Sequence, residues 1–197
     1  MIKTSRWPLA GLLMLCLLLA AGCAKQATPT VYLLLESPEA PQEFESPSSF
    51  ECLQIGPVTV SGYLNQANMV VRKTPWSLGY NETHRWAEPL DLGLARLMAQ
   101  GAEEVGLAHH AHLYPDESHL ACQGPRISVQ VLRFDVTQKG EATLKARWQR
   151  ADDKVTGVET LRTTVAPEAA PYQKVRALSG LVFEFCQRLK KATEQMQ

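Results

Sequence analysis

The densest group of side chains that could do chemistry lies between residues 109 and 119. Four histidines and two carboxylates stand there: His109, His110, His112, Asp116, Glu117 and His119. Imidazole and carboxylate groups bind metals, but only where several of them converge on one point. The His-His-x-His spacing puts no ligand pair on one helix face, and the His-Glu-x-x-His arrangement is absent. We therefore predict solvated loop histidines and no metal, with a weak metal site as the alternative.

The sequence also lacks the patterns of nucleophilic and phosphate chemistry. It contains no Gly-x-Ser-x-Gly, no Ser-x-x-Lys and no phosphate-binding glycine loop. Its thiols have no histidine in a sequence context that would activate them. The carboxylates are dispersed, and the pairs Glu103-Glu104 and Asp152-Asp153 are typical of solvated faces or turns. We predict no catalytic residue, no cofactor and no enzymatic activity.

The N-terminal segment has the pattern of an export signal. Lys3 and Arg6 precede an apolar run of 13 residues from Leu9 to Ala21, which ends in small residues before Cys23. A helix of that length cannot span about 30 Å of hydrocarbon, but it suits the apolar region of a signal peptide.

The end of this segment, Leu19-Ala20-Ala21-Gly22-Cys23, resembles a bacterial lipobox. In a lipobox the cysteine thiol is acylated and the chain is cut in front of it. The resemblance implies a lipoprotein signal peptide over residues 1–22, lipidation at Cys23 and a lipidated tether over residues 23–30. Ala24, rather than Asp, implies export to the periplasmic face of the outer membrane. The alternative is an ordinary secretory signal with an incidental cysteine.

The charge balance of the remaining chain argues against nucleic acid as a partner. Removing residues 1–22 from 197 leaves 175, with 18 basic and 20 acidic residues and a net charge of about −2. The basic residues are scattered, and no basic run would follow a phosphate backbone. This length suffices for one domain with its own core.

Three cysteines follow the lipobox: Cys52, Cys122 and Cys186. An oxidising compartment favours one disulfide and one free thiol, and three pairings are open. Cys52 and Cys122 both lie in polar surroundings before predicted strands, whereas Cys186 lies beside an apolar helix stripe. We favour a Cys52–Cys122 disulfide, with three unpaired thiols as the alternative.

Hydrophobic periodicity predicts seven strands and two helices. The strands are expected at residues 31–35, 53–60, 69–73, 76–86, 127–137, 141–150 and 158–165. One helix opens at Glu88-Pro89 and ends near Gly106, and the other begins at about Pro171. Residues 107–125 show little periodicity. The pattern predicts an α+β fold, a mostly antiparallel sheet with two helices packed on one face, as a single domain over residues 31–197.

Two strands and the last helix carry more detailed signals. The apolar phase changes at Pro57, which predicts a sheet edge or a bulge there. It changes again between Val131 and Leu132, which predicts a second bulge. The apolar stripe from Tyr172 to Leu189 predicts packing onto the sheet, with a coiled-coil partner as the alternative.

Several short segments together match the pattern of a known family. They are Leu53-Gln54-Ile55-Gly56-Pro57-Val58-Thr59-Val60, Tyr63-Leu64, Met69-Val70-Val71-Arg72, His84-Arg85-Trp86-Ala87-Glu88-Pro89-Leu90, Val131-Leu132-Arg133-Phe134-Asp135 and Ala146-Arg147-Trp148. With the lipobox, they resemble the PqiC-like (paraquat-inducible protein C) lipoproteins, also called ABC-type transport auxiliary lipoproteins, over about residues 31–190. The Arg-Trp-Ala-Glu-Pro-Leu run is the most specific part.

The resemblance implies a non-catalytic accessory of an MCE (mammalian cell entry) type phospholipid transport system. The implied partners are an MCE-domain protein with its permease complex, the outer-membrane lipid bilayer and a homo-oligomer. The alternative is a structural lipoprotein that scaffolds another complex of the cell envelope.

Two places on the chain are candidates for contact with such a partner. Trp86 at a strand-to-helix corner would bury a large surface, while Arg85 and Glu88 would pair across the turn or cap the helix. This predicts a structural corner, with a partner surface of Arg85, Trp86 and Glu88 as the alternative. Tyr63 and Leu64, in a loop next to a glycine, are the second candidate surface.

Overall fold

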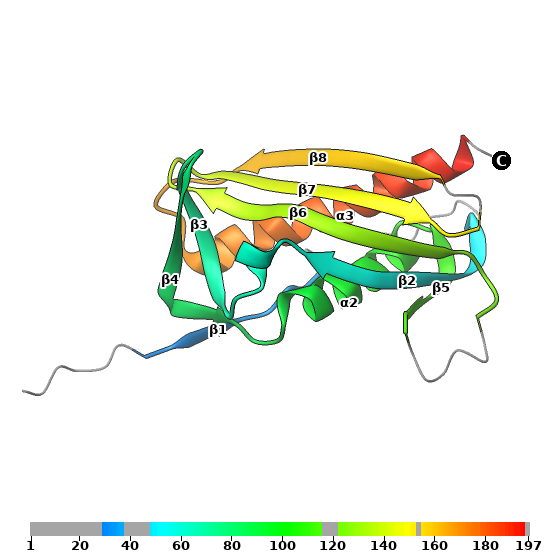
Figure 1. Cartoon of the computed structure of the whole chain (residues 1–197), viewed down its shortest axis with the longest axis horizontal. Helices are drawn as coiled ribbons and strands as arrows, with labels where there is room; N and C mark the ends of the chain where they lie inside the picture. The colour runs from blue at the N-terminus through cyan, green and yellow to red at the C-terminus, as the bar shows by residue number, and fades with distance from the viewer. Residues whose placement is uncertain (1–28, 38–47, 116–121, 153–154, 196–197) are drawn as a thin grey trace, which may run out of the picture.

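One eight-stranded sheet carries two helices on one of its faces (Figure 1). The computed structural model describes residues 29–37, 48–115, 122–152 and 155–195. The strands are β1 (Val31–Leu33), β2 (Phe50–Val60), β3 (Asn68–Thr74), β4 (Ser77–Trp86), β5 (Ala108–Leu113), β6 (Arg126–Thr137), β7 (Glu141–Arg150) and β8 (Thr156–Thr164). The helices are α2 (Leu90–Glu104) and α3 (Pro171–Glu194), with a short 3-10 turn η2 (Gly62–Leu64) after β2. This agrees with the predicted α+β class.

Strand β6 organises the sheet. Along one edge it pairs with β7, which in turn pairs with β8. Along its other edge it pairs with β2 near its start and with β3 near its end. The chain between β2 and β3, including η2, lies against the middle of β6. The remaining strands extend the sheet outward, β5 from β2 and β4 then β1 from β3.

The sheet is mixed, and most of its paired residues lie in antiparallel ladders, in agreement with the expectation of a mostly antiparallel sheet. Three pairings are antiparallel (β3–β4, β6–β7 and β7–β8) and four are parallel (β1–β4, β2–β5, β2–β6 and β3–β6). Parallel pairs need a long connection, and the chain between β2 and β5 or between β3 and β6 supplies one through α2. Apolar alternation reports which face is buried, not the direction of the neighbouring strand.

Both helices cover the same face and close one core. Helix α2 begins after Pro89, and Gly106, with φ of +69°, lies just past its end. The stripe of α3 is buried from Val175 to Leu189, whereas Tyr172 is exposed. Strands β6, β7 and β8 contact α3, and β2 and β5 contact α2. The predicted packing of the last helix onto the sheet is confirmed.

The predicted phase changes both coincide with irregular pairing. The register between β2 and β6 shifts between Ile55 and Val58, around Pro57, and the register between β6 and β7 shifts between Val131 and Arg133. Beyond Pro57, β2 has left its partner β5, so the residue also lies at a local edge. The β6–β7 hairpin turns at Gly140, which has a φ of +86°.

Strand β5 was not predicted. Its sequence, AHHAHL, lacks apolar alternation because it is an outer strand of which only Ala108 is fully buried. It forms because β2 offers a free edge, with Phe50 to Ile55 opposite Ala108 to Leu113. None of the helices in the described ranges is long and apolar enough to cross a membrane.

Candidate functional site

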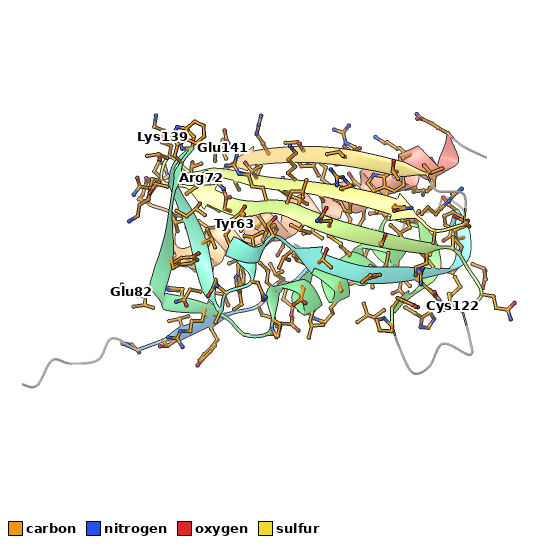
Figure 2. The ribbon with its side chains drawn as sticks, in the orientation of Figure 1. Tyr63, Arg72, Glu82, Cys122, Lys139 and Glu141 are labelled. Atoms are coloured by element: carbon orange, nitrogen blue, oxygen red, sulfur yellow. A yellow bond between two sulfur atoms is a disulfide. The ribbon has the colours of Figure 1, made fainter. Side chains whose placement is uncertain are left out.

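A buried carboxylate lies on the face of the sheet that the helices leave open. Asp135 points to the same side of β6 as Arg133, opposite Thr143 of β7, and its side chain is 0% exposed. Figure 2 shows Tyr63 and Arg72 beside this part of the sheet, with Glu141 and Lys139 toward the β6–β7 turn. A carboxylate on an open sheet face is buried only if other side chains cover it.

Two arginines cover and neutralise Asp135. Arg72, on β3, donates from Nη2 to Oδ2 at 2.8 Å and from Nε to both carboxylate oxygens at 3.1 and 3.2 Å. Arg133 donates from Nε to Oδ1 at 3.0 Å. This charge-assisted geometry links β3 to β6 where the two strands have just begun to pair.

Tyr63 closes the cluster from η2. Its hydroxyl donates to the carbonyl of Leu132 at 3.3 Å and lies 3.5 Å from Asp135 Oδ2. The guanidinium carbon of Arg72 lies 5.9 Å from the centre of the Tyr63 ring. The backbone N–H of Ser61 donates to the carbonyl of Val131 at 2.9 Å, which holds the turn against the β6 bulge.

The electrostatics of the cluster hold Tyr63 and Arg72, which both lie against Asp135, each in a single protonation state. Burial raises the pKa of Tyr63, and the charge of Asp135 raises it further. The hydrogen bond to Asp135 raises the pKa of Arg72. Tyr63 therefore stays neutral and Arg72 stays charged over the physiological range. The arrangement holds three segments of chain together and presents a half-buried tyrosine ring at the surface.

The open face around the cluster is rich in cations. Lys145 lies opposite Arg133, and Arg147 lies opposite Gln130, so both point outward beside the cluster. Arg162 of β8 and Arg133 each approach Glu141 to 3.9 Å. Of the charged residues named on this face, Arg72, Arg133, Lys145, Arg147 and Arg162 are positive and only Asp135 and Glu141 are negative, so the face carries net positive charge. We call Tyr63, Arg72, Arg133, Asp135, Lys145 and Arg147 the open-face cluster.

Two residues of the predicted contact surfaces are buried. Leu64 and Trp86 lie in the core, and the Trp86 ring stands 6.3 Å from that of Phe134. Their burial favours the structural interpretation of the Trp86 corner, because neither side chain offers more than 7% of its surface to a partner. Arg85 is exposed.

Glu88 at the same corner pairs with a residue that the sequence did not single out. Arg96 of α2 donates to Glu88 Oε1 at 2.8 Å and to the carbonyl of Leu35 at 2.7 Å. The corner is thus closed by a helix residue eight positions on, rather than by Arg85.

Cys52 and Cys122 form a disulfide, with their Cα atoms 5.7 Å apart. This is the pairing favoured from the sequence. Cys186 is a buried free thiol against Gly101 of α2, and burial raises its pKa to about 12.

The histidine segment is divided between β5 and residues outside the described ranges. His110 and His112 lie on β5 opposite Cys52 and Gln54 of β2. Asp116, Glu117 and His119 lie outside the described residues, as does Cys23 with the predicted signal peptide. Within the described residues, no group of three metal-ligand side chains converges.

Sequence reasoning named Tyr63 but not Arg72, Arg133 or Asp135 as site residues. All three lie in segments that carried the family resemblance. Asp135 lies between Phe134 and Val136 in a strand that also carries several other polar residues, so its charge alone gave no usable signal. Which residue would meet that carboxylate could not be read from the pattern, because Arg72 is 63 positions away.

The chain matches the family described as "ABC-type transport auxiliary lipoprotein component" over residues 32–189. This protein belongs to that family. An accessory role in transport therefore fits its fold and its open, polar sheet face. No curated protein sequence matches it significantly.

Two solved structures share the fold at low sequence identity, and a third is less similar. A protein described as uncharacterised has a TM-score of 0.65 at 14% identity, covering 84% of this chain and 99% of its own. A Xanthomonas campestris protein of the family DUF330 has a TM-score of 0.56 at 17% identity, covering 85% and 95%. PelC from Paraburkholderia phytofirmans, a dodecamer, has a TM-score of 0.38 at 10% identity, covering 72% and 91%.

Proposed function

We propose that this protein is a lipid-anchored, non-catalytic accessory of an MCE-type phospholipid transport system, held at the periplasmic face of the outer membrane. The observation that carries the proposal is the family match over residues 32–189, which covers nearly the whole folded part of the chain. Cys23 would carry the acyl chains, and residues 23–30 would tether the domain to the bilayer.

The open-face cluster supports a docking role. The Asp135 carboxylate lies 2.8 Å from Nη2 of Arg72 and 3.0 Å from Nε of Arg133, so it holds β3 and β6 together. Lys145 and Arg147 project beside it from β7, with Tyr63 at its edge. A rigid, basic sheet face suits an acidic surface of a protein partner, because complementary charge speeds and orients association. We propose this face, and not Leu64 or Trp86, for the MCE-domain protein with its permease.

Crosslinking in membranes tests the proposed partner. The full chain is crosslinked in cells, purified from solubilised membranes, and its partners and bound lipids are identified by mass spectrometry. An MCE-domain protein with its permease, together with phospholipid, is the expected result. Recovery of an unrelated envelope assembly machine alone would contradict the proposal and favour the scaffolding role. The mass of the purified complex also tests the proposed homo-oligomer.

Metabolic labelling with palmitate tests the anchor. The wild-type chain should incorporate label and fractionate with outer membranes, whereas Cys23→Ser should do neither. An unlabelled wild-type chain in the culture fluid would contradict the anchoring. The variant changes no residue of the described fold, so its loss of membrane attachment would report on the thiol alone.

A further inference from the structure

Exposed aromatic side chains gather at the end of the molecule from which the N-terminal tether leaves. Tyr32 on β1 and Tyr172 on α3 each expose 66% of their surface, and Trp76, in the β3–β4 turn, exposes 95%. Tyr80 on β4 is exposed as well. Figure 1 shows β1 and the β3–β4 hairpin together at this end. Among the exposed aromatic residues in the described ranges, Tyr114 alone lies elsewhere.

Contacts join β1 to the end of β4 that lies away from the β3–β4 turn, and a groove joins β1 to α3. Tyr32 stands beside Arg85 in the β1–β4 pair, and β4 is bonded to β3. Tyr32 and Leu34 also form one wall of a groove of about 370 Å³, and Tyr172 and Val175 of α3 form the other. We call Val31, Tyr32, Leu34 and Tyr172 the anchor-end surface.

The anchor-end surface has the composition of a membrane interface. Val31 and Leu34 are exposed along with the two tyrosines. Leu34 and both tyrosines line the same groove, together with the charged residues Glu36 and Arg176. Tyrosine and tryptophan concentrate at headgroup level because the ring is apolar and its tip is polar. Arg85 is exposed next to Tyr32, where its guanidinium can meet a lipid phosphate.

The length of the tether brings this surface to the bilayer. Strand β1 begins at Val31, eight residues after Cys23. Eight extended residues reach at most about 29 Å, and a relaxed tether is shorter. An anchor at Cys23 therefore keeps Val31 close to the membrane, and the anchor-end surface with it.

We propose that the anchor-end surface lies on the phospholipid bilayer itself, with Tyr32 and Tyr172 at headgroup level and the groove between them open to lipid. The inference rests on the proposed lipidation of Cys23. It adds a second, non-covalent contact that sets the orientation of the domain, so that the open sheet face is held at a constant angle to the membrane.

Quenching by brominated lipid tests this orientation. The full lipidated chain is reconstituted into vesicles of phosphatidylethanolamine and phosphatidylglycerol with brominated acyl chains. A single reporter, Tyr172→Trp or Tyr32→Trp, is introduced into a Trp76→Phe background, in which the native Trp86 and Trp148 stay buried. Val158→Trp, at an exposed position on the open sheet face, is the matched control.

Quenching at positions 172 and 32 should exceed that at position 158 several-fold. Equal quenching at all three positions, in a chain that floats with the vesicles, would overturn the proposed contact of the anchor-end surface with the bilayer. It would leave the lipid anchor at Cys23 intact. Equal quenching with emission from position 172 already blue-shifted in detergent would also overturn the contact, in favour of a second copy on this surface. A chain that does not float with the vesicles would overturn both the lipid anchor at Cys23 and the contact of the anchor-end surface with the bilayer.

Discussion

At the scale of single residues, Asp135 shows how a charged side chain can be buried on an open sheet face. Arg72 and Arg133 cover the carboxylate and keep part of their own surface in water, with 17% and 24% exposure. Each guanidinium thus keeps some hydration while it pairs, which lowers the cost of burying the charge. Tyr63 could be named from the sequence because it lies in a short turn. Asp135 could not, because a strand aspartate usually faces water.

Asp135→Asn should destabilise the fold by about 3 kcal/mol, because two guanidinium groups would lose the charge that neutralises them. Urea unfolding followed by circular dichroism measures the change. Glu141→Gln, whose ion pairs are 3.9 Å long and partly exposed, is the control and should cost under about 1 kcal/mol. Equal effects of the two substitutions would contradict the central place given to Asp135.

Cys186 should make the fold sensitive to alkali. Its pKa is raised from 9.0 to about 12 by burial, so above pH 9 the unfolded thiol loses its proton while the folded one keeps it. The folded state then binds more protons, and the free energy of unfolding falls as the pH rises from 9 toward 12. Below pH 9 this contribution is fully present.

Urea unfolding at a series of alkaline pH values checks this dependence. Cys186→Ala should show a shallower decline than the wild-type chain, in addition to a uniform loss from the cavity. Tyr63→Phe is the comparison, since the pKa of Tyr63 is raised from 10.0 and its effect begins at higher pH. Parallel curves for Cys186→Ala and the wild type would be inconsistent with the thiol as the source.

At the scale of elements, the two phase changes explain how the site is assembled. The register between β2 and β6 shifts near Pro57, where the pairing of β2 with β5 has already ended, and the register between β6 and β7 shifts just after Val131. On the other edge of β6, between its β2 and β3 pairings, the 3-10 turn with Tyr63 lies beside this irregular part of β6 and donates a hydrogen bond to the carbonyl of Leu132. Both irregularities were predicted from the sequence. Their joint consequence, a turn docked on β6, was not.

Trp86→Ala should lower stability by about 3–5 kcal/mol and Tm by roughly 10 °C, because the indole fills the corner between β4 and the core. Differential scanning calorimetry measures the shift. Arg85→Ala, at the exposed neighbouring position, should leave Tm within about 1 °C of the wild-type value. An unchanged Tm with lost partner binding in Trp86→Ala would contradict the structural corner.

Removing the disulfide should cost about 2–4 kcal/mol, because it closes a long loop between β2 and the segment before β6. The double variant Cys52→Ala, Cys122→Ala should unfold at the same urea concentration with and without reductant. The wild-type chain and Cys186→Ala should both lose stability when reduced. A double variant as stable as the oxidised wild-type chain would show that the crosslink contributes nothing.

At the scale of the whole molecule, three surfaces are distinct. The helices cover one face of the sheet, the open-face cluster lies on the other, and the anchor-end surface lies at the end of the molecule that carries β1 (Figure 1, Figure 2). In the arrangement that we propose, a domain held to the membrane at the β1 end presents its open sheet face to a protein partner in the periplasm. The proposed lipid contact and the proposed protein contact then use different surfaces.

Reversing the charge of the open face should weaken capture of the partner without changing the fold. Lys145→Glu with Arg147→Glu should reduce crosslinked MCE-domain protein several-fold, at a Tm near that of the wild-type chain. Arg188→Glu with Lys191→Glu makes the same change of charge at exposed positions on α3 and should capture partner normally. Equal losses in both variants would show that net charge, not this face, governs the association.

The sequence by itself determined the elements and the class of protein. Hydrophobic periodicity and the breaks that proline and glycine make in helices and strands are local signals, so the predicted helices and most strands agree with the structure. The segments that carry the family resemblance are contiguous runs and are local in the same way. Tertiary structure alone decided the parallel pairings, strand β5, the partner of Glu88 and the enclosure of Asp135 by Arg72. Each of these depends on which distant segment packs at a given edge or face of the sheet. A local sequence pattern does not contain that information, because the contacting residues are far apart in the sequence.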